Sequence, residues 1–106
     1  MILTGKCNED FEKWFKANVS YEYYGDQSSY NITEDFTDIP FSMQYGVYVD
    51  FFDSVGVIIE IQADDQSDYF IVLIDNLFNG SGKTRHEART KAIEKANELY
   101  NNKNVK

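Results

Sequence analysis

The sequence predicts a small α+β domain, with an antiparallel sheet of two or three strands and helices near residues 8–18, 40–55 and 84–100 packed on one side. Two short apolar runs separated by a polar turn are typical of a β-hairpin. A helical repeat of apolar residues near the end of the chain indicates a long amphipathic helix. The chain has 106 residues and a hydrophobic content of 42%, enough for one core, so we expect a single domain over residues 1–106.

The first helix is predicted from the spacing of its aromatic residues. Phe11, Trp14 and Phe15 stand at positions i, i+3 and i+4, and therefore share one helical face. The acids of Asn8-Glu9-Asp10 stand in the first turn, where the helix dipole favours negative charge. The next segment, residues 19–37, mixes turn-forming and aromatic residues without a lasting period, and we interpret it as a loop packed on the domain.

Residues 40–55 allow two interpretations. As a helix, the segment places Met43 and Val47 on a broad apolar arc. Pro40 then stands near the helix start, and Gly56 stands where a glycine commonly follows a helix end. As a strand, the aromatic and β-branched residues of the segment would alternate with its other residues. The two end signals favour the helix.

The predicted hairpin joins a strand at 57–63 to a strand at 69–74 through the polar turn 64–68. The first strand alternates between apolar and polar residues, as expected of a strand with one buried face. The second strand, Tyr-Phe-Ile-Val-Leu-Ile, is apolar enough to be covered on both faces. Leu77 and Phe78 allow a short third strand beside it.

The last helix carries the strongest local signals. Thr84 and Glu87 form a capping box, in which the threonine side chain caps the helix and the glutamate reaches back. A helical stripe then follows at Ala88, Ala92, Ile93, Ala96, Leu99 and Tyr100.

The charge distribution is the most distinctive feature of the chain. Its net charge is −8, and the charges are unevenly distributed. Residues 17–82 contain no Lys or Arg, and most of the bases lie in residues 83–106. An acidic surface of this kind attracts basic partners over long range. The alternatives are that the basic helix packs across the acidic sheet and neutralises part of it, or that the acids serve solubility. The candidate partner-binding acids are Glu34, Asp35, Asp38, Asp50, Asp53, Asp64, Asp65 and Asp68.

Catalysis is not predicted. Cys7 is the only cysteine and His86 the only histidine, and neither forms a recognisable nucleophile–base arrangement. The acidic clusters lack the glycine-punctuated spacing of a calcium loop. The segment 79–84 resembles part of a phosphate-binding loop, but Leu77 stands where that motif requires glycine. We therefore expect a non-enzymatic protein with no cofactor and no metal site.

The sequence also bears on localisation. The first residues lack the apolar core of a signal peptide, and no apolar run approaches the length of about 18 residues that a membrane span needs. The single cysteine cannot form an internal disulfide, and a reduced cysteine fits a reducing compartment. We therefore expect a cytoplasmic protein with no membrane segment.

The segment Gly82–Arg89, followed by an alanine-rich helix, resembles the final helix of double-stranded-RNA-binding domains. Those domains run helix, three strands, helix, and hold phosphates across a groove with bases at this helix start. The resemblance implies an RNA contact by Lys83, Arg85, Arg89 and Lys91. A helix at 40–55 and an acidic body that repels RNA argue against this alternative, and we do not expect nucleic-acid binding.

A wider resemblance covers about two thirds of the chain. It links the protein to a group of small bacteriophage and prophage proteins whose final helix has the pattern TRxEARxxAIEKANELYN, and it involves residues 11–15, 39–48, 53–56, 84–89 and 92–101. The resemblance implies expression inside an infected bacterial cell, and it brings no functional residues with it. Our leading hypothesis is an accessory protein that binds and modulates a host protein with a basic surface, such as a defence nuclease. A phage structural or assembly protein is a further alternative.

Overall fold

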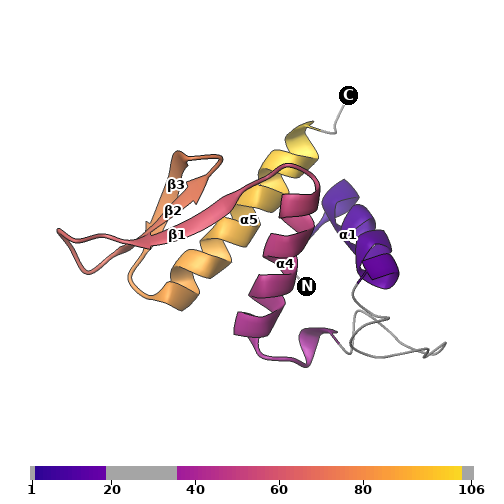
Figure 1. Cartoon of the computed structure of the whole chain (residues 1–106), viewed down its shortest axis with the longest axis horizontal. Helices are drawn as coiled ribbons and strands as arrows, with labels where there is room; N and C mark the ends of the chain where they lie inside the picture. The colour runs from indigo at the N-terminus through magenta and orange to yellow at the C-terminus, as the bar shows by residue number, and fades with distance from the viewer. Residues whose placement is uncertain (1, 19–35, 104–106) are drawn as a thin grey trace.

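The computed structural model describes residues 2–18 and 36–103, and Figure 1 shows its elements along the chain. They are α1 (Gly5–Asn18), α4 (Phe41–Ser54), β1 (Ile59–Ala63), β2 (Phe70–Ile74), β3 (Leu77–Gly82) and α5 (Arg85–Lys103). The predicted α+β fold is confirmed, and so is the helical interpretation of residues 40–55. The loop predicted at 19–37 lies outside the described residues except at its end.

The three strands form one antiparallel sheet in the order β1-β2-β3. The third strand is therefore present, and it is longer than predicted. Asp75 and Asn76 join β2 to β3 with positive φ angles of 54° and 67°, the backbone of a tight hairpin turn that matches the strand twist. A β-bulge between Val72 and Leu73 interrupts the pairing of β2 with β3.

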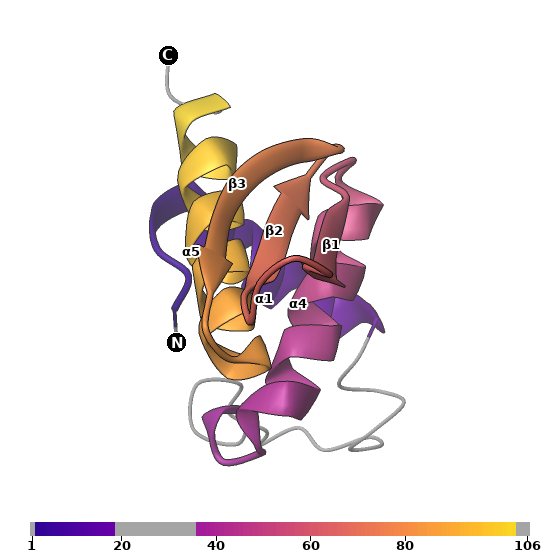
Figure 2. The ribbon, with the colours of Figure 1, turned by 90° about the vertical axis from the view of Figure 1, so that its left-hand side faces the viewer.

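The helices are stacked on one side of the sheet. α5 crosses the sheet and contacts all three strands, whereas α4 contacts β1 and α5. α1 packs against α4 and α5 and forms a further layer. Figure 2 is turned toward the sheet, and in this view the strands lie in front of α5 and α1.

The core joins an aromatic cluster between the helices to the inner face of the sheet. Phe11 of α1 lies at its centre, with ring centroids 5.1 Å from Tyr48 and 5.4 Å from Phe51 of α4. On α5 three alanines and one isoleucine are fully buried, and small side chains at this spacing let the helix approach the sheet closely. These α5 residues are Ala88, Ala92, Ile93 and Ala96.

Two residues expected on buried faces are exposed. Leu99, the predicted continuation of the α5 stripe, is 38% exposed, and Met43 of the predicted α4 arc is 55% exposed. Leu99 lies close to the C-terminal end of α5, where it lines a surface groove instead of the core. Met43 lies in the first turn of α4, before the helix reaches the aromatic cluster. Helical spacing predicted the face of each residue but not where that face leaves the core.

α1 and α5 are both longer than predicted, because the start of α1 and the end of α5 are held together by hydrogen bonds. Asn97 Oδ1 accepts a hydrogen bond from Thr4 N at 2.9 Å, and Asn101 Oδ1 accepts one from Cys7 N at 2.8 Å. Asn101 Nδ2 in turn donates to Thr4 O at 2.9 Å. These amides serve N–H groups at the start of α1 that have no partner within their own helix. α1 therefore begins at Gly5 instead of residue 8, and α5 continues to Lys103 instead of residue 100.

The start of α5 is capped locally, as predicted. Thr84 Oγ1 accepts a hydrogen bond from Glu87 N at 3.1 Å. Glu87 Oε2 accepts one from Lys83 N at 2.9 Å, which is one residue earlier than the usual reciprocal bond of a capping box. The capping box is confirmed, with this shift in its return bond.

Candidate functional site

The structure places the candidate acids in three groups. Asp38 precedes α4, Asp50 and Asp53 lie on the exposed side of α4, and Asp64, Asp65 and Asp68 lie in the β1–β2 loop. Figure 1 shows β1 running from the end of α4 to this loop. The five residues of β1 extend over about 17 Å at roughly 3.3 Å per residue. Glu34 and Asp35 lie outside the described residues. The described acids therefore occupy separate regions instead of one compact patch.

Asp64 has a structural role in its loop. Its Oδ1 accepts a hydrogen bond from Gln66 N at 3.0 Å, and its Oδ2 accepts one from the Ser67 hydroxyl at 2.8 Å. These bonds, the one from Gln66 N above all, lower the pKa of the Asp64 carboxyl. Asp65 and Asp68 are exposed. A partner would therefore meet Asp65 and Asp68 most directly.

The candidate bases diverge from one another around the start of α5. The Arg85 guanidinium lies over the Phe70 ring of β2 at 5.0 Å, and that of Arg89 over the Tyr45 ring of α4 at 5.3 Å. Lys91 Nζ donates a hydrogen bond to Ser81 O of β3 at 2.6 Å. Lys83 is exposed just before the helix. Two of the four bases thus turn toward aromatic rings, and a third turns toward the edge strand.

Within the part of the chain that the structure describes, the basic helix does not pair directly with the acids of residues 36–82. The two ion pairs given for the described residues lie within single helices: Lys6–Asp10 at 3.2 Å and Lys95–Glu98 at 3.6 Å. No ion pair joins α5 to the described acids of residues 36–82. The acids of α4 and of the β1–β2 loop therefore have no ion-pair partner on α5.

The two side chains best suited to catalysis, the Cys7 thiol and the His86 imidazole, are packed against other residues. Cys7 is fully buried, and burial, with a further effect of Asp10, raises the pKa of its thiol to about 12. The His86 ring packs edge-on against Phe41, with centroids 5.0 Å apart. Among the described residues no three His, Cys, Asp or Glu side chains come close enough to hold a metal ion.

The outer face of the sheet is a surface that the candidate residues did not include. Leu73 of β2 lies between Glu60 and Phe78, and Ile71 lies between Gln62 and Ser81. Residues directly opposite in an antiparallel pair share a face, and the face with Val72 and Ile74 is the one buried by the helices.

The outer face exposes much apolar surface. Phe78 is 67% exposed, and Ile58 and Tyr69, which continue the alternation at the strand ends, are 47% and 43% exposed. The sequence carried a signal for this surface, because it predicted β2 to be covered on both faces. Within the described residues only the inner face is covered, so that prediction is wrong for the outer face.

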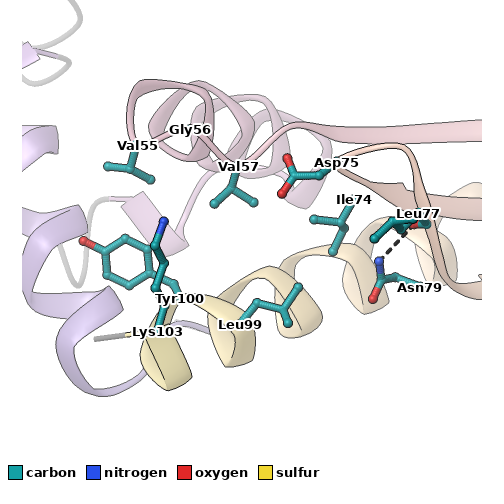
Figure 3. A pocket seen from close by; sticks show the side chains of 10 residues that line it. All are labelled: Val55, Gly56, Val57, Ile74, Asp75, Leu77, Asn79, Leu99, Tyr100 and Lys103. Atoms are coloured by element: carbon teal, nitrogen blue, oxygen red, sulfur yellow. Dashed lines mark hydrogen bonds between the residues drawn. The ribbon is translucent and has the colours of Figure 1, made fainter. Parts of the chain in front are cut away.

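A groove of about 530 Å³ lies at the opposite end of the sheet from the acidic loop. Figure 3 shows side chains of the α4–β1 turn, the β2–β3 hairpin and α5 converging on it. Val57, Leu77 and Leu99 give it apolar walls, while Asp75 and Lys103 add opposite charges. Asp75 is also structural, because its Oδ1 accepts a hydrogen bond from Ile58 N at 2.9 Å. The groove has no arrangement of groups suited to catalysis among the residues that line it.

Comparison with protein-family models, curated proteins and solved structures finds no match to this chain. Across residues 2–18 and 36–103, no helix combines the length and apolarity needed to cross a membrane.

Proposed function

We propose that the protein is a non-enzymatic accessory protein that modulates a partner protein by binding to its basic surface. The observation that carries the proposal is the absence of bases from the central segment, together with the lack of ion pairs from α5 to its described acids. Residues 17–82 contain no base, and no ion pair joins α5 to the described acids among them. Such a surface accelerates association with a cationic partner and disfavours anionic ones.

The β1–β2 loop is the part of the acidic surface best placed for first contact. It projects from one end of the molecule in Figure 1 and carries Asp65 and Asp68 in exposed positions. The resemblance to phage proteins suggests that the partner belongs to the bacterial host. Nucleic-acid-binding enzymes have basic surfaces, and a defence nuclease is one concrete form of such a partner.

The test begins with a tagged copy of the protein, purified from bacterial lysate with its bound proteins. Association rates with the recovered partner are then measured across salt concentration for the parent and for Asp65→Lys/Asp68→Lys. We expect the parent on-rate to fall about tenfold or more with salt, and the double variant to associate slowly even at low salt. Asp64 is left intact, because its hydrogen bonds shape the loop.

The control is Glu94→Lys/Glu98→Lys, which makes the same change in net charge at exposed positions of α5. It separates a local role of the loop from an effect of total charge. If the loop variant associates as fast as the parent at every salt concentration, the proposal fails, and an apolar assembly contact becomes the better account.

One observation favours a second candidate, binding of double-stranded RNA. This observation is the order of the elements. α4 runs directly into β1, and the chain from α4 to α5 therefore has the order helix, three strands, helix. The helix at α4 is thus no argument against RNA binding. The electrostatic objection stands. A duplex is held by bases across successive grooves, whereas α4 and the sheet carry acids and no bases.

Fluorescence anisotropy with duplex RNA decides between the two candidates. We expect no binding near physiological salt. Micromolar binding there, weakened by Arg85→Ala/Arg89→Ala with a flatter salt slope, would replace the proposal with RNA binding.

A further inference from the structure

We infer that the outer face of the sheet is a docking surface for a cationic, amphipathic segment of a partner protein. This inference rests on the proposed function for the sign of the partner's charge, and it adds the place and the chemistry of the contact. The outer face is defined here as Ile58, Glu60, Gln62, Tyr69, Ile71, Leu73 and Phe78.

The centre of the outer face is apolar. Ile71 and Leu73 lie side by side along β2, and Phe78 stands directly opposite Leu73 on β3. Phe78 is 67% exposed, although it is among the largest apolar side chains of the domain. The helices cover the other face of the sheet, and no described element lies over this one. Apolar side chains gathered on an open face are typical of an interaction site.

The surroundings of this apolar centre carry negative charge. Glu60 stands directly opposite Leu73 on β1, on the other side from Phe78. Asp65 and Asp68 lie beyond one end of the strands, and Asp75 lies beyond the other end. The strands and the two hairpin turns contain no Lys or Arg, and one exposed base, Lys83, follows β3 at the end where Asp65 and Asp68 lie. Arg85 lies over Phe70, a residue in register with the inner-face positions, and so belongs to the helix side.

Charge complementarity selects the occupant. A second copy of the chain would bring another acidic rim against this one, and each copy has a net charge of −8. A segment that alternates Lys or Arg with apolar side chains satisfies both parts of the surface. Its bases would meet Glu60 and the acids of the turns, and its apolar side chains would cover Leu73 and Phe78. A guanidinium could also stack on the exposed Phe78 ring.

The probe is a synthetic amphipathic peptide of leucine and lysine, with an all-lysine peptide of equal length and charge as the comparison. Titration of the labelled peptides into the full chain gives dissociation constants. We expect the leucine–lysine peptide to bind more tightly than the all-lysine peptide. Phe78→Ser and Glu60→Lys should each weaken its binding about tenfold, the effect of losing one central contact.

Matched controls keep the test specific. Leu99→Ser removes an exposed apolar side chain from the groove, and Glu94→Lys reverses an exposed charge on α5; both should leave binding unchanged. Phe78 and Glu60 are exposed, so their variants should stay folded, which circular dichroism checks.

The possible failures are distinguishable. If Phe78→Ser binds both peptides like the parent while Asp65→Lys/Asp68→Lys slows association with the recovered partner, the docking face is wrong and the proposed function stands. If neither peptide binding nor partner association changes in any variant of the acidic residues, both the docking face and the proposed function are wrong. If sedimentation shows a parent dimer that Phe78→Ser dissolves, a second copy occupies the face and the inference is overturned.

Discussion

The two faces of the sheet contain similar residues but have different surroundings. On β2, Val72 and Ile74 are buried beneath the helices, while Ile71 and Leu73, their neighbours in sequence, lie on the outer face between Glu60, Gln62, Phe78 and Ser81. The inner face adds to the domain's core, and the outer face adds apolar surface within an acidic rim. Apolar content alone therefore does not tell whether a strand face is core or contact surface; its neighbours across the sheet decide.

The largest change in stability should appear at alkaline pH, and it should come from the helices that cover the inner face of the sheet. Burial raises the pKa values of Cys7, Tyr48 and Tyr100 to about 12, with a further contribution at Tyr100 from its hydrogen bond to Asp10. Each group is neutral in the folded state and ionises earlier in the unfolded chain, from ordinary values of 9.0 for the thiol and 10.0 for the tyrosines. Their stabilisation is complete below about pH 9 and is lost as the pH rises toward 12.

Urea unfolding at a series of pH values measures this loss. The loss comes mainly from Cys7 and Tyr48, which are fully buried, because solvent screens the only partly buried Tyr100. Tyr48→Phe removes one of the three groups and should make the alkaline decrease shallower. An unfolding free energy that stays level from pH 9 to 12 would contradict the assigned burial of these groups.

Ile93→Ala should cost about 2–5 kcal/mol of unfolding free energy, because the side chain is fully buried where α5 covers the inner face. Leu99→Ala on the same helix is the control. Leu99 is 38% exposed in the groove, and its truncation should cost well below the Ile93 value. Equal costs in chemical denaturation would mean that α5 does not cover the sheet as described.

Gly82→Ala should cost about 1–3 kcal/mol through overpacking. A Cβ added to Gly82 would lie 2.6 Å from Ala88 N, at the point where the end of β3 meets the start of α5. Gly46 of α4 offers the opposite case, since an added Cβ there meets nothing within 4 Å. Gly46→Ala should stabilise the helix by about 0.5–1 kcal/mol. Thermal unfolding of the two variants should therefore shift in opposite directions.

Phe78→Ser should change the unfolding free energy least, by about 0.5 kcal/mol, because the side chain is mostly exposed on the outer face. The unfolding free energies of Phe78→Ser and Ile93→Ala together compare how much the outer and inner faces contribute to stability. A loss of several kcal/mol for Phe78→Ser would show that part of the chain covers this face, and would remove it as a docking surface.

Local patterns predicted the covered side of the domain well. The capping box at Thr84 and Glu87 and the buried positions of α5 follow from residues within a few turns of one another. The sequence also showed the base-free segment, but not that its described acids fall into three groups. Their separation depends on the direction in which β1 leaves α4.

Contacts between distant residues were beyond prediction. The start of α1 is held by the side-chain amides of Asn97 and Asn101. They accept hydrogen bonds from Thr4 N and Cys7 N, which lie 93 and 94 positions away in the sequence. Nothing in the residues around Gly5 indicates an earlier helix start. The groove and the outer face likewise arise only when the hairpin and α5 are placed together.

The asparagine caps on α1 set an order of events during synthesis. A ribosome releases α1 long before it releases α5, whose asparagines cap it, so the first turn of α1 has only water as a partner until Asn97 and Asn101 have been made. The rings of α1 find their partners earlier, because Phe11 packs against Tyr48 and Phe51 of α4. A stop codon before Asn97 would therefore leave the first turn of α1 without its caps, although the lesion lies 93 positions away from Thr4.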